Sequence, residues 1–122
     1  MISKETAEIS NAYVVKCLQD EGITITRVYS CFHKREDSCP CIKPNSFFLY
    51  KAEMEYNVDL ERSYVIGDHP HDMEFACNVG ATGLYLLTGH GRKHLNEVSN
   101  EAEIFQSLYD SADWIISHKH TE

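Results

Sequence analysis

The sequence predicts an α/β fold in which helices cover a parallel β-sheet. The run Tyr64–Ile66 is short and apolar throughout, as expected of a strand buried on both faces, and Gly67 ends it. A second apolar run, at 83–87, enters the glycine-rich turn "TGHG". The segment between these runs has the features of a helix. Such a helix is the crossover that two parallel strands require.

The N-terminal part predicts a helix followed by a strand. From Ser3 to Glu21 the apolar residues fall roughly on one helical face, with Ser3 as the N-cap and Gly22 as the stop. Residues 23–30, "ITITRVYS", alternate and are rich in β-branched side chains, which predicts a strand. A loop over about 31–43 comes next, and a second helix is expected to begin near Asn45 or Ser46.

The C-terminal part continues the alternation. A helix is predicted over about 70–78, with Pro70 in its first turn. A last helix over about 99–111 precedes a short strand at Trp114–Ile116. The sequence has no repeat and no interdomain linker, so residues 1–122 are predicted to form a single domain.

Composition narrows the class of protein. The net charge is -8, from 19 acidic and 11 basic residues, which disfavours nucleic acid as a partner because phosphates require a basic surface. No apolar run approaches the roughly 20 residues of a membrane helix. The N-terminus lacks the pattern of a signal peptide, so a cytoplasmic location is expected.

The loop "CFHKREDSCPCIKP" concentrates soft metal ligands. Three thiolates and one imidazole form a closed tetrahedral set typical of structural zinc, and sulfur ligands select against magnesium and calcium. In a reducing compartment clustered cysteines bind metal more often than they pair. A redox pair and unpaired surface cysteines remain as alternatives. The residues concerned are Cys31, His33, Cys39 and Cys41. The other two cysteines, Cys17 and Cys77, are predicted to be small core residues.

A pair of carboxylates follows the first apolar run. Asp68 stands at the carboxyl end of that strand, where ligands gather in open α/β sheets, and Asp72 begins the next helix. Two carboxylates there suit Mg²⁺, although acidic residues also occur at helix N-termini as caps. The flanking His69 and His71 are expected to face solvent. Lys43 has the compact charge that suits a phosphate, and a surface lysine is the alternative.

The turn Gly89–Gly91 is a weaker candidate for ligand binding. Glycine lets the backbone come close to a ligand, so the N–H groups of this turn could approach an anion.

Taken in order, "CFHKREDSCPCIKP", "VIGDHPHD" and "VGATGLYLLTGHG" resemble one family. It is the zinc-containing branch of the haloacid dehalogenase (HAD) superfamily of phosphatases, which includes D-glycero-D-manno-heptose 1,7-bisphosphate phosphatase and the histidinol-phosphate phosphatase domain. The resemblance covers about residues 22–92. It implies that the loop ligands bind zinc and that Lys43 steadies the phosphate and an aspartyl nucleophile. It also implies that Asp68 binds Mg²⁺ and that Asp72 supports the site.

The chain departs from this family pattern at its start. The family's nucleophile lies in an Asp-x-Asp-x-Thr segment on the first strand, and no Asp-x-Asp occurs in these 122 residues. Ile42 stands where the branch has an arginine, and Phe47 where a glycine is common. The resemblance therefore implies a partial Rossmann-like HAD fold, with parallel strands 3, 4 and 5 and without strands 1 and 2.

The functional expectation is a truncated derivative of a sugar-phosphate or histidinol-phosphate phosphatase, inactive as an isolated chain. The alternative is a non-catalytic, zinc-stabilised binding or regulatory module. Expected partners are a phosphorylated small molecule and either a second copy of the chain or a complementary N-terminal segment. The last two would fill the sheet, because unpaired strand edges tend to pair with other chains. In the absence of such a partner, the strands at 23–30 and 64–66 are expected to close up against each other.

Overall fold

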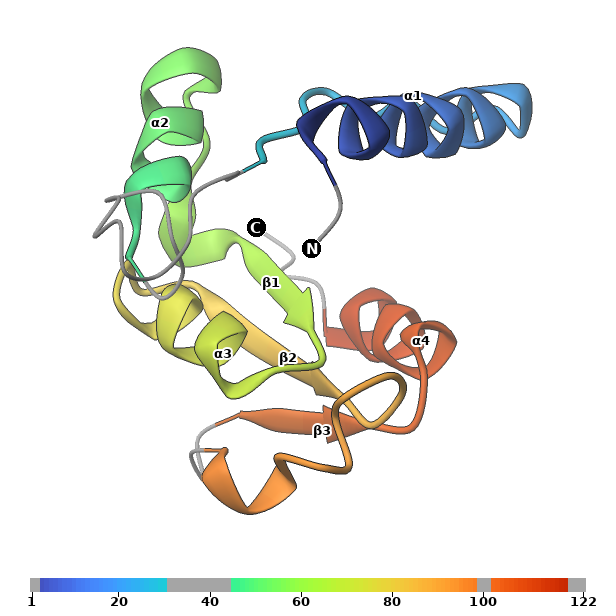
Figure 1. Ribbon diagram of the computed structural model, residues 1–122. Helices are drawn as coiled ribbons and strands as arrows, with labels where there is room; N and C mark the ends of the chain where they lie inside the picture. The colour runs from blue at the N-terminus through green and yellow to red at the C-terminus, as the bar shows by residue number, and fades with distance from the viewer. Residues whose placement is uncertain (1–2, 31–44, 99–101, 119–122) are drawn as a thin grey trace. The chain divides into compact units, whose positions relative to one another are not determined.

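The structure is a computed structural model that describes residues 3–30, 45–98 and 102–118 (Figure 1). Contacts within the chain gather in two compact units, Met1–Asp37 and Ser38–Glu122. The two units are described one after the other.

The first unit contains one helix, α1 (Lys4–Asp20), among its described residues. The Ser3 hydroxyl accepts a hydrogen bond from the Thr6 backbone N–H at 3.1 Å, and Gly22 ends the helix with a φ of 82°. Both features confirm the predicted helix boundaries. Asn11 Nδ2 donates to Ser30 Oγ at 3.1 Å, which ties the helix to the segment that follows it.

The strand predicted at 23–30 is wrong, because this segment has no regular secondary structure. Its apolar side chains are not buried as in a sheet, since Ile23 is 49% exposed and Val28 is 44% exposed. β-branched composition favours a strand only where neighbouring strands cover it, and none of the strand pairings in the described chain involves these residues.

The second unit is built on a three-stranded parallel sheet. Its strands are β1 (Tyr64–Gly67), β2 (Thr82–Leu86) and β3 (Glu103–Phe105), in the order β1-β2-β3. Tyr64 pairs with Thr82, and Leu84 pairs with Glu103. The predicted α/β class and the two predicted apolar strands are confirmed.

The described part of this unit also contains three α-helices, α2 (Phe47–Tyr56), α3 (Pro70–Cys77) and α4 (Leu108–His118). Two short 3-10 helices lie at Leu60–Arg62 and Leu95–Glu97. The helices predicted near residue 46 and at 70–78 are confirmed. Of the described helices, none is long and apolar enough to cross a membrane.

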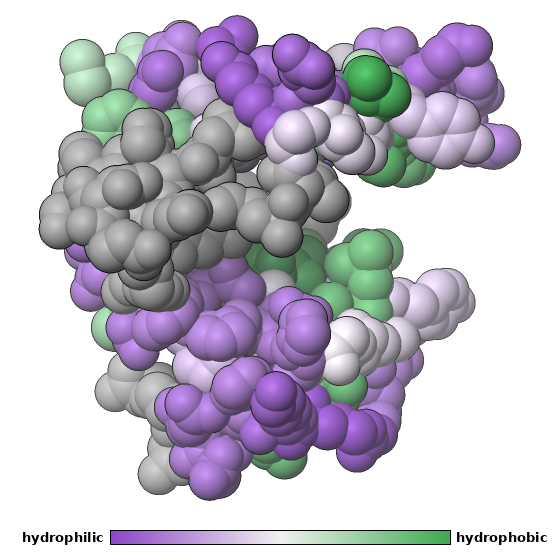
Figure 2. Space-filling model, in the orientation of Figure 1, coloured by the Kyte–Doolittle hydropathy of each residue, from purple (hydrophilic) through white to green (hydrophobic). Residues whose placement is uncertain are grey.

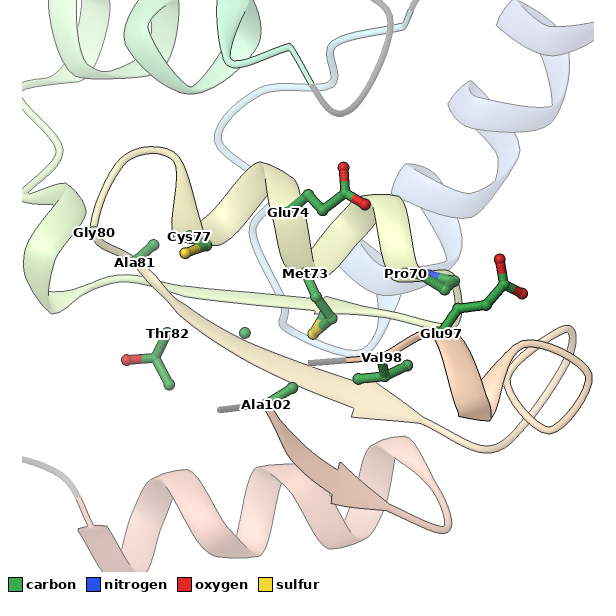
Figure 3. A pocket seen from close by; sticks show the side chains of 11 residues that line it. Pro70, Met73, Glu74, Cys77, Gly80, Ala81, Thr82, Glu97, Val98 and Ala102 are labelled. Atoms are coloured by element: carbon green, nitrogen blue, oxygen red, sulfur yellow. The ribbon is translucent and has the colours of Figure 1, made fainter. Parts of the chain in front are cut away.

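Helices α3 and α4 cover opposite faces of the sheet (Figure 3). Successive side chains on a strand alternate between the two faces. Gly83 of β2 faces Met73 of α3, whereas Tyr64 of β1 and Phe105 of β3 meet the indole of Trp114 of α4. The central strand is therefore buried on both sides, and Leu84 and Tyr85 are both 0% exposed.

The C-terminal elements differ from those predicted. The helix expected over 99–111 is replaced by β3 and the first turn of α4, and the strand expected at Trp114–Ile116 lies inside α4. Ser107 explains the later start of the helix, because its hydroxyl accepts from the Asp110 backbone N–H at 3.2 Å. The cysteine prediction was also wrong. Cys17 and Cys77 are both exposed thiols rather than core residues.

Candidate functional site

The candidate site is built where β1 and β2 end side by side. Gly67 at the end of β1 pairs with Tyr85 of β2. Asp68 follows β1 directly, and Asp72 lies in the first turn of α3 with only 7% of its surface exposed. Asp72 packs back against Gly67 so closely that a side chain at Gly67 would overlap its carboxylate. Both predicted carboxylates therefore lie at the carboxyl end of one strand.

The turn after β2 holds the Asp68 carboxylate. The backbone N–H of His90 donates to Asp68 Oδ2 at 3.0 Å. Gly89 has a φ of 57°, and a Cβ atom at this position would overlap the same oxygen. Sequence reasoning expected the N–H groups of this turn to approach an external anion, but the structure shows that the His90 N–H binds the protein's own Asp68.

Tyr85 anchors the turn to strand β2. Its hydroxyl donates to the carbonyl of Gly91 at 2.6 Å, and Gly91 N–H closes the turn on the Thr88 carbonyl at 2.9 Å. Burial raises the pKa of the Tyr85 phenol, and the nearby Asp68 carboxylate raises it further. The phenol therefore stays protonated and keeps its role as a donor. Sequence reasoning missed Tyr85, because an aromatic residue inside an apolar strand looks like an ordinary core residue.

Three histidine rings gather beside the carboxylates. The ring of His69 stacks on that of His71 at a centroid distance of 4.7 Å and lies 4.7 Å from that of His94. Burial lowers the pKa of His69, and the neighbouring rings of His71 and His94 lower it further, so His69 is mostly uncharged at neutral pH. His69 and His71 were expected to face solvent; both are half-buried, and His71 keeps 35% of its side chain exposed.

His94 was not singled out from the sequence. It reaches the cluster from the loop after β2, where its Nδ1 forms a short hydrogen bond with a carboxylate oxygen of Glu97. Hydrophilic residues dominate the visible surface around the 3-10 helix Leu95–Glu97 (Figure 2). No local sequence pattern links this loop to β1, so only the fold brings His94 to His69.

The donor set of the site fits a magnesium ion better than a transition metal. Across 3–30, 45–98 and 102–118, no group of three or more His, Cys, Asp or Glu side chains is arranged to hold a metal. Mg²⁺ requires fewer protein ligands, because it keeps several waters and binds through one or two carboxylates. Asp68 and Asp72 supply two carboxylates at the same strand end.

A family comparison agrees with this arrangement. The family model described as HAD-hydrolase-like matches residues 40–111, a span that contains β1, α3, β2 and both carboxylates. The chain belongs to the HAD-hydrolase-like family. The resemblance noted from the sequence is thereby confirmed.

Two curated proteins are similar to this chain in sequence. The histidine biosynthesis bifunctional protein HisB of Campylobacter jejuni is 31% identical over 119 residues, which cover 98% of this chain and 32% of that protein. The D-glycero-beta-D-manno-heptose-1,7-bisphosphate 7-phosphatase of Helicobacter pylori is 31% identical over 85 residues, covering 70% of this chain and 49% of that protein. The chain thus spans half or less of the length of these relatives.

A solved structure shares the HAD fold. The D,D-heptose 1,7-bisphosphate phosphatase of B. bronchiseptica, complexed with magnesium and phosphate, superposes with a TM-score of 0.86 at 23% identity. The superposition covers 94% of this chain and 65% of that one. The HAD fold of the chain is therefore three parallel strands flanked by helices, as seen in the second unit.

Five predicted site residues of this HAD chain lie outside the described residues. They are Lys43 and the four proposed zinc ligands Cys31, His33, Cys39 and Cys41. Their predicted roles stay predictions.

A cavity of about 570 Å³ lies on the α3 face of the HAD sheet, away from the carboxylates (Figure 3). Met73 and Cys77 of α3, Thr82 of β2 and Val98 are among the residues that line it. Neither Asp68 nor Asp72 lines it. Glu97, which binds His94 of the histidine cluster, does line it, so the cavity adjoins the candidate site without including its carboxylates.

Proposed function

We propose that this chain carries the downstream part of a Mg²⁺-dependent HAD phosphatase site for a sugar phosphate or histidinol phosphate. The observation that supports it is the placement of Asp68 and Asp72 at the end of β1, each packed against a glycine of the strand end or turn. The heptose bisphosphate phosphatase relatives and the histidine biosynthesis protein HisB support the proposed substrate class.

Each residue of the proposed site has a distinct role. Asp68 would bind Mg²⁺ directly, Asp72 would support the site from α3, and Lys43 would place a positive charge on the phosphate. Bound Mg²⁺ would neutralise charge on the phosphate oxygens. The zinc proposed for the 31–43 loop would organise that loop, because four protein ligands leave no position for a reacting water.

The proposed site is incomplete without a nucleophile. Covalent phosphoryl transfer in this family needs one aspartate to attack phosphorus and another to act as acid and base, and the 122 residues contain no Asp-x-Asp. In the described sheet β1 is an edge strand whose only neighbour is β2. We therefore propose that the site works only when a segment bearing Asp-x-Asp-x-Thr, which lies outside these 122 residues, pairs with this open edge.

Complementation tests this proposal. The chain should be assayed with Mg²⁺ and p-nitrophenyl phosphate, histidinol phosphate or heptose 1,7-bisphosphate, with and without an N-terminal fragment of the Helicobacter pylori relative. We expect no hydrolysis by the chain alone, because loss of a catalytic nucleophile typically lowers rates by several orders of magnitude. Addition of the fragment should produce turnover. Asp68→Asn in the chain should abolish it, whereas Asp113→Asn on the exposed surface of α4 should not.

Two outcomes would contradict the proposal. Mg²⁺-dependent turnover by the chain alone that Asp68→Asn abolishes would show that no external nucleophile is required. Binding of the fragment without any turnover would favour a non-catalytic, zinc-stabilised module. This is the second candidate function, and it is supported by the lack of Asp-x-Asp in these residues.

A further inference from the structure

We propose that the turn Thr88–Gly91, anchored by Tyr85, acts as a positioning clamp for Asp68 and sets the affinity of the site for a divalent cation. The inference rests on the proposed function, since it assigns the cation to Asp68. It adds three positioning residues, Tyr85, Gly89 and His90, that act through the carboxylate without touching the substrate.

The first part of the clamp is the backbone of the turn. Asp68 lies just beyond the end of β1, so the strand does not fix its side chain by itself. The His90 N–H donates to Oδ2 at 3.0 Å, so a backbone group of the turn holds one oxygen of the carboxylate. Gly89 lies against the same oxygen at a φ of 57°, so any side chain at this position would push the carboxylate away.

The second part of the clamp is the anchor of the turn on β2. The buried Tyr85 hydroxyl holds the Gly91 carbonyl at 2.6 Å, and a side chain at Gly91 would overlap the carbonyl oxygen of Leu86. The turn is therefore packed on its own strand and cannot move away from β1 without breaking a buried hydrogen bond, which would leave an unpaired polar group. Partners that orient a metal ligand typically contribute 10- to 100-fold to metal affinity.

The decisive comparison is between two glycines of the same unit. Gly89→Ala introduces a methyl group against Asp68 at a φ of 57°, whereas Gly80→Ala introduces one at a φ of 78° whose nearest neighbour is Glu61 Cγ at 3.6 Å. Both variants carry a similar backbone cost, and only the first disturbs the carboxylate. Mn²⁺ binding to the full chain, followed by electron paramagnetic resonance with Mg²⁺ as competitor, should weaken at least about 10-fold in Gly89→Ala. It should stay within about 2-fold of wild type in Gly80→Ala.

A second variant tests the anchor without a steric clash. Tyr85→Phe removes only the hydroxyl that holds Gly91, so Mn²⁺ affinity should fall by about 3- to 10-fold with circular dichroism unchanged. Equal Mn²⁺ affinity in Gly89→Ala and Gly80→Ala would overturn the proposal, and so would wild-type affinity in Tyr85→Phe.

A measurement without metal separates this inference from the proposed function. The His90 amide should exchange with solvent more slowly in the wild-type chain than in Asp68→Ala, by about 10-fold or more, because the carboxylate accepts its hydrogen bond. Equal exchange rates would overturn the clamp whatever the metal result. If the wild-type chain binds no Mn²⁺ but its His90 amide is protected, the proposed cation site fails while the contact between turn and carboxylate stands.

Discussion

At the scale of single residues, the site depends on glycines that make room for carboxylates. Gly67 accommodates Asp72 and Gly89 accommodates Asp68, so each acidic side chain lies directly on backbone. Close packing of this kind makes the position of an oxygen atom sensitive to a single methyl group. The glycines therefore determine where the carboxylates lie as much as the aspartates do.

Gly67→Ala should destabilise the second unit by about 2 kcal/mol through overpacking. The added methyl group would meet Asp72 at its Cβ, Cγ and Oδ2 atoms, so the whole side chain must move. Gly83→Ala is the matched control on β2, because the nearest atom is the Met73 sulfur at 2.7 Å, near the end of an unbranched side chain that can change rotamer. Urea denaturation should rank Gly67→Ala well below Gly83→Ala in unfolding free energy, and the reverse order would contradict the packing described here.

The aspartates could be predicted from sequence, whereas their partners could not. Asp68 and Asp72 follow an apolar run that ends in glycine, a local pattern that indicates the end of a strand. Tyr85, His90 and His94 reach them from the next strand and its loop. Those contacts depend on strand register, which a local pattern does not reveal.

At the scale of elements, predictions succeeded where the local signals and the packing agree. Helices α1 and α3 have a cap or a proline at their start and were found close to their observed ends. The elements of the C-terminal region were predicted wrongly because apolar residues continue through β3 and α4 with a spacing that also fits one helix. The Ser107 cap was the signal that separates the two elements.

Trp114→Ala should loosen α4 from the sheet and lower the unfolding free energy by about 2 kcal/mol, less than for a fully buried tryptophan. Its indole meets the rings of Tyr64 and Phe105 at centroid distances of 6.2 and 5.9 Å, which joins α4 to both edge strands. Ile116→Ala is the control on the same helix, since Ile116 is 71% exposed. Thermal denaturation should shift clearly for Trp114→Ala alone, and equal shifts would contradict this role.

At the scale of the whole molecule, the sequence predicted a parallel α/β fold and the structure confirms it for the second unit. The prediction of a strand at 23–30 was wrong because strand formation depends on the assembled sheet. Those residues have no strand partner in the described chain. The same reasoning assigns β1 the open edge to which a complementary segment is proposed to bind.

Zinc is predicted to stabilise the whole chain at a ratio of about one ion per chain. Elemental analysis of purified protein should find this stoichiometry, and a chelator should lower the melting temperature. A Cys39→Ser, Cys41→Ser double variant should lose zinc. A Cys17→Ser, Cys77→Ser double variant, which changes two exposed thiols on helices, should keep it. Undiminished zinc in the first variant would remove Cys39 and Cys41 as ligands.

The order of the sheet also has a consequence for how the chain folds. Each strand pairs with the next one along the sequence, first β1 with β2 and then β2 with β3. Pairings between close neighbours in sequence close shorter loops and lose less chain entropy than pairings between distant segments. The three strands can therefore pair with one another without a further strand at the free edge of β1. A complementary strand would then bind to an edge of the sheet that is already formed.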